Sequence, residues 1–127
     1  AQMAVRQEVN WVDLTYALPV YRVWDTNEVV DYGGTELRVW QQSYQLRWPS
    51  LAAAVATSLR QNSTFADKDA YRQVDIAGLD GAWYVPGGME YVALAGNRVV
   101  YATVIGEERD DSLLLRLLEE TAALWAQ

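Results

Sequence analysis

The residues of this sequence that could do chemistry are carboxylates, because the chain contains no histidine and no cysteine. Acidic side chains gather in three short ranges, 25–31, 67–69 and 107–111. Two carboxylates can hydrolyse a glycosidic bond when they flank a cleft and an apolar environment keeps one of them protonated. All three ranges instead fall in expected turns or at an expected helix start, where solvent keeps the acids ionised. The sequence therefore predicts a protein that is not an enzyme.

Motifs for other reactions and for bound ions are also missing. The sequence has no nucleophile-elbow serine, no phosphate-binding loop and no dinucleotide-binding glycine motif. The only lysine, Lys68, lies between Asp67 and Asp69, which favour its charged form and make it unsuitable for Schiff-base chemistry. The oxygen-rich ranges 25–28 and 67–69 lack the twelve-residue ligand spacing and central glycine of a calcium loop. We therefore expect no metal and no cofactor.

Tryptophan and tyrosine are the unusual feature of the composition, since the chain has six Trp and eight Tyr but one Phe. Both carry a polar group on an apolar ring, which suits half-wet surfaces, interfaces and sugar-stacking platforms. The densest stretch is residues 40–48, where the side chains of a strand would alternate between two faces. Trp40, Tyr44 and Trp48 share one parity, and Gln41, Gln45 and Arg47 share the other. These six residues are the predicted partner-binding site.

Two arrangements of this stretch remain open. In the first, the aromatic side chains are core beneath a helix, and the Gln/Arg parity is the exposed surface of the sheet. In the second, the aromatic face is exposed, with Gln41, Gln42, Gln45 and Arg47 at its rim. We expect Arg47 to contribute to binding in either case, because a planar guanidinium stacks and donates several hydrogen bonds.

These residues indicate a non-enzymatic binding or assembly domain that docks a protein partner, or a second copy of itself, through a Trp/Tyr/Arg-rich sheet face. The alternative is a small-ligand or glycan-binding module with an apolar pocket between sheet and helix. A flat, exposed aromatic face would favour the first function, and a closed pocket with convergent polar groups would favour the second.

The charge of the chain narrows the choice of partner. The net charge is −7, and an acidic surface repels phosphate, so binding of nucleic acid and of anionic membranes is not expected. Residues 32–60 are locally basic, with three arginines against Glu36, whereas residues 107–120 hold six acids and two arginines. The acidic range 107–111 is the next candidate contact if the aromatic strand is not the site.

No apolar run reaches the length that a membrane span needs, so we expect no membrane insertion of this segment. The first residues are consistent with two origins of the N-terminus. Met3 is a native start, or Ala1 is the residue that follows a removed signal peptide or anchor. If Ala1 follows a removed segment, the protein is extracytoplasmic, either secreted or anchored by a preceding segment, and this is the expected location. A cytoplasmic location is the alternative.

Strand patterns dominate the first 48 residues. Residues 5–11 alternate with a break near Trp11, and 20–24 and 29–32 are expected strands separated by a turn at 25–27. Glycines 33 and 34 predict a hairpin turn into a long strand over 35–48. The apolar parity changes at Trp40, which predicts a twist or bulge midway along that strand.

Two helices and further strands follow. Pro49 and Ser50 predict a helix start with Ser50 as the cap, and Leu51, Val55 and Leu59 form its apolar stripe. Strands are expected at 71–77, 82–85, 89–95 and 98–105, joined by short glycine-containing turns. The last of these is apolar on both parities, which is typical of a central strand with a helix on one face.

The terminal helix is expected over residues 112–125, capped by Asp110 or Asp111, with Leu117 and Leu118 in the core. The order strands–helix–strands–helix predicts an α+β fold, a mostly antiparallel sheet with one central and one C-terminal helix packed on it. No linker or repeat divides the chain, so residues 1–127 are expected to form a single domain.

The last third of the chain resembles a known family. Residues 96–105 (GNRVVYATVI), an acidic loop and a terminal helix ending in Leu124 and Trp125 are similar to the ending of PsbP/Mog1-like α/β/α domains. Those domains carry a hairpin strand followed by a helix packed on the sheet, and they occur in photosystem subunits, adaptors and bacterial lipoproteins. The resemblance implies a non-catalytic binding role.

Overall fold

The structure is a computed structural model that describes residues 10–13, 20–32, 35–63, 68–87, 89–105 and 111–126. Its strands are β1 (Asn10–Asp13), β2 (Val20–Tyr32), β3 (Thr35–Leu46), β4 (Arg72–Gln73), β5 (Gly81–Tyr84), β6 (Glu90–Ala95) and β7 (Arg98–Ile105). Its helices are α1 (Pro49–Gln61), the short 3-10 helix η1 (Lys68–Ala70) and α2 (Asp111–Trp125).

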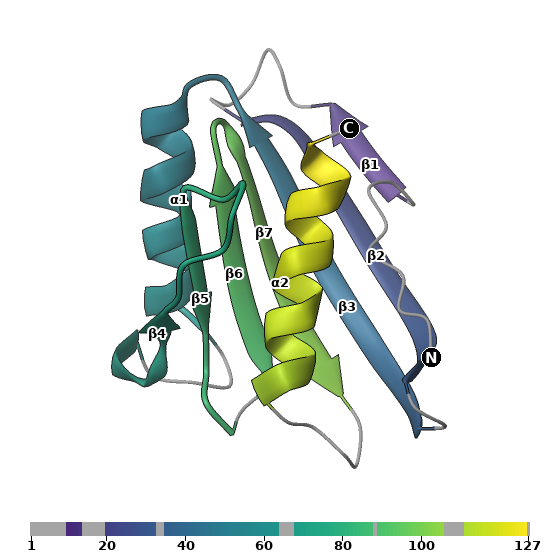
Figure 1. Cartoon of the computed structure of the whole chain (residues 1–127). Helices are drawn as coiled ribbons and strands as arrows, with labels where there is room; N and C mark the ends of the chain where they lie inside the picture. The colour runs from purple at the N-terminus through teal and green to yellow at the C-terminus, as the bar shows by residue number, and fades with distance from the viewer. Residues whose placement is uncertain are drawn as a thin grey trace.

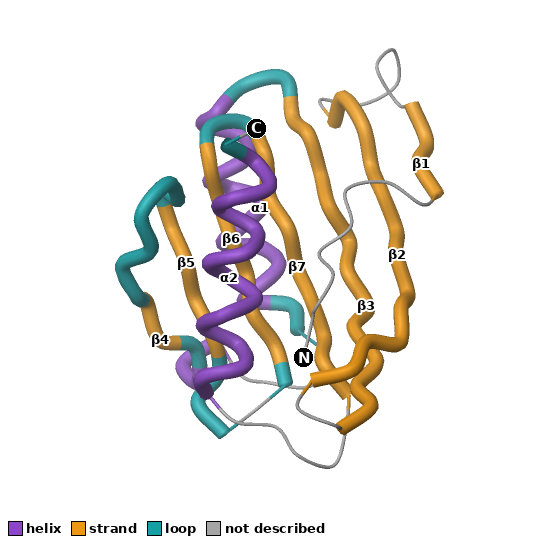
Figure 2. The backbone as a smooth tube through the Cα atoms, turned by 45° about the vertical axis from the view of Figure 1, so that its right-hand side comes forward, coloured by secondary structure: helices purple, strands orange, loops and turns teal. Residues whose placement is uncertain are grey.

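The strands form one sheet in the order β1-β2-β3-β7-β6-β5-β4, and each neighbouring pair is antiparallel. The helices lie on opposite faces of this sheet. Helix α2 crosses in front of the sheet in Figure 1, and Figure 2 shows α1 behind β6 and β7. This arrangement confirms the predicted α+β fold with one central and one C-terminal helix on an antiparallel sheet.

Two hydrophobic clusters, one on each face, hold the helices to the sheet. The buried members of the α1-side cluster are Leu46, Ala52, Ala56, Val92, Val99 and Tyr101. Those of the α2-side cluster are Val39, Ala82, Tyr91, Ala93, Val100, Ala102, Val104, Leu113, Leu114, Leu117 and Leu118. Successive residues of β6 and β7 therefore enter different clusters, as the alternation of a strand requires. The prediction that β7 is central is confirmed, but a helix covers each of its faces rather than one.

Helix α1 forms where alanine and leucine predict it, and Pro49 occupies its first turn, where a missing N–H costs nothing. The predicted cap is wrong: Trp48 is the N-cap residue, and its side chain makes no capping hydrogen bond. Ser50 lies inside the first turn instead. Ala52 and Ala56 are fully buried, because their small side chains let the helix lie close to the sheet.

The predicted turn at residues 25–27 is also wrong. Strand β2 continues through this range, with Asp25, Thr26 and Asn27 paired with β3. Pairing along the long hairpin outweighs the local turn preference of these residues. The irregularity in the hairpin lies between Val20 and Arg22 of β2.

No bulge interrupts β3 at Trp40, since its register with β7 runs without a break from Arg38 to Gln45. The change of apolar parity has another cause, because the two faces of the strand meet different helices. Val39 belongs to the α2-side cluster, whereas Trp40 and Tyr44 pack against the α1-side cluster.

The edge strand that pairs with β5 is shorter than predicted. The strand expected over 71–77 is reduced to β4, and Val74 and Ile76 pack against the α2-side cluster from an irregular segment. The hairpin turn at Gly96 is confirmed, with a φ of 56° that glycine adopts without steric cost. Residues 5–9, 33–34, 64–67 and 106–110 lie outside the described residues, and the expectations that fall on them are not tested.

Candidate functional site

The strand predicted to carry the binding site divides its residues between two environments. Trp40 and Tyr44 are half-buried against the α1-side cluster. The Trp40 ring packs edge-to-face with the Tyr101 ring, with the two centroids 6.3 Å apart and an angle of 89° between the ring planes. Tyr44 donates its hydroxyl to Gln42 Oε1 at 3.2 Å. The aromatic face of the strand is therefore covered by α1, and it is not a flat, open platform.

Gln41 lies on the other face, and here the structure corrects the prediction. Its side chain is 2% exposed and its Nε2 donates to the Tyr91 hydroxyl at 2.8 Å. A core position accepts this amide because Tyr91 supplies a partner. Gln41 is thus a core residue beneath α2, and it does not line an exposed rim.

Arg47 and Trp48 differ from the rest of the stretch because they follow the end of β3. Both are exposed, and Trp48, at 55%, is the exposed large hydrophobic side chain of the described residues. An open depression of about 370 Å³ beside them is lined by Gln45, Leu46, Arg47 and Asn97. We call the surface made by Gln45, Arg47, Trp48 and Asn97 the β3–α1 corner.

Hydrogen bonds fix the backbone on both sides of this corner. Leu46 N donates to Asn97 O at 2.8 Å, and Asn97 Nδ2 donates back to Leu46 O at 2.9 Å. The carbonyl of Trp48 accepts from the amides of Leu51 and Ala52 at 3.1 and 3.2 Å. Arg47 and Trp48 therefore project from a backbone that is held by the β6–β7 turn and by the start of α1.

A buried carboxylate that was not among the predicted site residues lies on the α1 side of the sheet. Glu90 is 0% exposed and accepts hydrogen bonds from Ser63 Oγ, at 2.6 and 2.7 Å to its two oxygens, and from Tyr71 OH at 2.6 Å. Burial raises the pKa of Tyr71, and the hydrogen bond to Glu90 raises it further. The phenol therefore remains a proton donor to the carboxylate.

A signal for this group was present in the sequence. Glu90 has the parity of Val92 and Leu94, so in a strand it points to an apolar face. A charged residue at such a position needs polar partners. The partners come from residues 63 and 71, which no local pattern connects to it.

A second unpredicted feature is a stack of a cation on an aromatic ring. The guanidinium carbon of Arg60, in the last turn of α1, lies 3.7 Å from the centroid of the Trp83 ring. The same ring lies back over Gly81, where any Cβ would collide with it. Trp83 is thus held between a glycine and a guanidinium.

This stack borders a cavity of about 430 Å³ at the C-terminal end of α1. The cavity is lined by Thr57, Arg60, Gln61, Asp69, Tyr71, Gln73 and Trp83, and we call it the Arg60 cavity. A smaller cavity of about 240 Å³ lies on the other side of the same helix end, lined by Trp40, Gln42, Ser58, Leu59, Asn62, Ser63 and Tyr101. The lining of both is mixed polar and aromatic, unlike the apolar pocket of the alternative function.

Within the described ranges, no three carboxylate, histidine or cysteine side chains are grouped so that they could hold a metal ion. In the same part of the chain, neither helix has the length and apolar character required to cross a membrane.

Comparison with protein-family models, with curated proteins and with solved structures found no match for this chain. The resemblance to PsbP/Mog1-like domains therefore stays a prediction. Two surfaces at opposite ends of α1, the β3–α1 corner and the Arg60 cavity, are the candidate binding sites.

Proposed function

We propose that the protein is a non-enzymatic binding domain that docks a protein partner through the β3–α1 corner. The observation that carries the proposal is the exposed Trp48 on a fixed backbone. Burial of a tryptophan ring supplies much of the energy of a protein interface, and an anchor that is already positioned loses little entropy on binding. Trp40 and Tyr44 support the corner from the α1-side cluster rather than touching the partner.

The charge of the corner favours an acidic segment as the partner. Arg47 is exposed and pairs with no carboxylate in the described part of the chain. A guanidinium binds a carboxylate through two parallel hydrogen bonds, so Arg47 beside Trp48 suits a peptide that carries Asp or Glu next to an apolar side chain.

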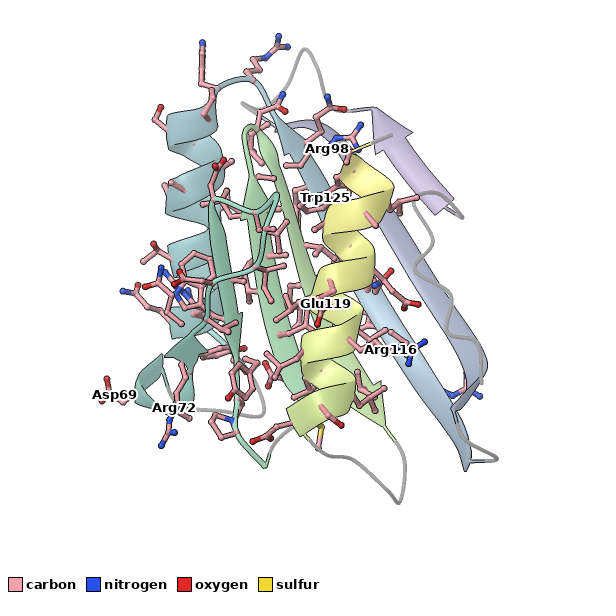
Figure 3. All side chains as sticks on the ribbon, in the orientation of Figure 1. Asp69, Arg72, Arg98, Arg116, Glu119 and Trp125 are labelled. Carbon is pink, nitrogen blue, oxygen red and sulfur yellow. The ribbon has the colours of Figure 1, made fainter. Side chains whose placement is uncertain are left out.

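Site-specific photo-crosslinking in the source cells tests where the partner binds. A photoreactive phenylalanine analogue replaces Trp48 in one variant and Glu119 in a control variant, since Glu119 is exposed on α2 at the other face (Figure 3). We expect one protein to crosslink through position 48 and not through position 119. Crosslinking from both positions alike would contradict a site at the corner.

Affinity measurements with the purified partner then test the roles of the two side chains. We expect Trp48→Ala and Arg47→Ala each to weaken binding by about tenfold or more, which is about 1.4 kcal/mol. Arg116→Ala, on the exposed face of α2, is the matched control and should leave the affinity unchanged. Unchanged binding by Arg47→Ala, Trp40→Ala and Trp48→Ala alike would move the site off this strand.

A further inference from the structure

We propose that the Arg60 cavity binds a neutral saccharide, a function separate from the docking of a protein at the β3–α1 corner. The two sites lie at opposite ends of α1, whose 13 residues span about 18 Å. The volume of about 430 Å³ lies in the range of small-molecule sites. Its occupant is identified by the hydrogen-bonding groups that line it.

Arg60 supplies hydrogen-bond donors whose position is fixed. Its guanidinium is stacked on Trp83, and one nitrogen donates to Thr57 Oγ1 at 3.2 Å. It forms no ion pair with a carboxylate of the described residues, so further N–H groups remain for a ligand. A guanidinium has five donors and no acceptor.

Asp69 supplies hydrogen-bond acceptors to the same cavity. It belongs to the lining and is exposed. Tyr71 also lines the cavity, and its phenol proton is donated to Glu90 at 2.6 Å. The lining thus combines the donors of Arg60 with the acceptors of Asp69.

A ligand that satisfies both kinds of group must itself accept and donate. A carboxylate or phosphate cannot donate, and an ammonium group cannot accept, whereas neighbouring sugar hydroxyls do both. The amides of Gln61 and Gln73 also donate and accept, which matches the same chemistry. The charges of Arg60 and Asp69 balance, and the net charge of −7 disfavours an anionic ligand.

Nuclear magnetic resonance of the full chain tests the proposal with maltose, cellobiose and N,N′-diacetylchitobiose as neutral probes and glucuronate as the charged probe. The readout is the indole N–H signal of Trp83, assigned by its loss in Trp83→Phe. We expect at least one neutral probe to shift this signal with a dissociation constant of about 1 mM or tighter, and glucuronate to shift it less.

Variants distinguish binding in the cavity from binding elsewhere. Gln73 is exposed at the sheet edge, so the Gln73→Ala variant is expected to fold. It should lower the affinity for the neutral probe by about fivefold, which corresponds to the loss of one hydrogen bond. Arg60→Lys should weaken it by at least as much, because lysine keeps the charge but not the planar fork. Arg72→Ala changes the preceding residue of the same strand, outside the cavity lining, and should change nothing (Figure 3).

Three results would overturn the proposal: no neutral probe shifts the Trp83 signal, glucuronate binds more tightly than each of them, or Gln73→Ala and Arg72→Ala behave alike. Trp48→Ala should leave the saccharide affinity unchanged. The test of the saccharide site is therefore independent of the test of the protein-binding site at the β3–α1 corner.

Discussion

Ser63 Oγ lies 2.6 and 2.7 Å from the two carboxylate oxygens of Glu90, a residue 27 positions further along the chain. The contact joins the segment that follows α1 to the start of β6, beneath the cavities at that end of the helix. Because Glu90 is fully buried, its hydroxyl partners replace the water that it has lost.

Loss of this contact should destabilise the protein measurably. We expect Ser63→Ala to lower the free energy of unfolding in urea by about 1–3 kcal/mol, the cost of removing one partner from a buried polar group. Ser50→Ala is the matched control, since Ser50 is exposed and does not cap α1, and it should change stability by less than about 0.5 kcal/mol. Equal effects of the two variants would show that Ser63 does not stabilise Glu90.

Packing of the terminal helix on the sheet gives a second prediction. Leu117 is 0% exposed in the α2-side cluster, so Leu117→Ala should cost about 2–5 kcal/mol through lost burial and the cavity that remains. Glu119→Ala, two residues later on the exposed side, should cost less than about 0.5 kcal/mol. A urea-unfolding loss below about 1 kcal/mol for Leu117→Ala would contradict the observed packing.

The elements predicted best are those whose patterns are local. The length of β7, its apolar residues on both parities and the apolar face of α2 are visible within 15 residues each, and the structure confirms them. The turn expected at 25–27 failed because hairpin pairing is a non-local effect that outweighs the preference of three residues.

The candidate site was only partly predictable for the same reason. Glutamine is usually a surface residue, and the burial of Gln41 depends on the hydroxyl of Tyr91, which is 50 positions away. The Glu90 contacts join three separate segments, and the Arg60–Trp83 stack joins a helix to a strand beyond a loop. The exposure of Arg47 and Trp48 arises from where β3 ends, and strand ends are among the least predictable features of a sequence.

Alkaline pH should weaken the fold through Tyr91. Burial raises the pKa of Tyr91 to about 12, although its hydrogen bonds with Gln41 and Thr121 oppose the rise. The phenol loses its proton more easily in the unfolded chain, where the pKa is about 10. The contribution of the Tyr91 phenol to the free energy of unfolding is thus fully present below about pH 10 and is lost as the pH rises towards about 12.

The measurement is the free energy of urea unfolding between pH 9 and pH 11.5. We expect it to fall with pH in the native protein and to fall less in Tyr91→Phe, which cannot ionise. The variant should also be less stable at neutral pH, by about 1–3 kcal/mol, because the buried hydrogen bond between the Gln41 amide and the Tyr91 hydroxyl is lost. Identical pH slopes would exclude Tyr91 as the titrating group.

The Gly81–Trp83 contact gives the final prediction, which concerns how the Arg60 cavity is built. A Cβ at residue 81 would collide with the six-membered part of the Trp83 ring, so Gly81→Ala must push the ring towards Arg60. We expect a loss of about 1–3 kcal/mol in unfolding free energy, the usual cost of overpacking. In a Trp83→Ala background the same substitution should cost less than about 0.5 kcal/mol, because the obstructing ring is gone. Additive effects of the two substitutions in this double-mutant cycle would mean that Gly81 is needed for its backbone alone and does not make room for the ring.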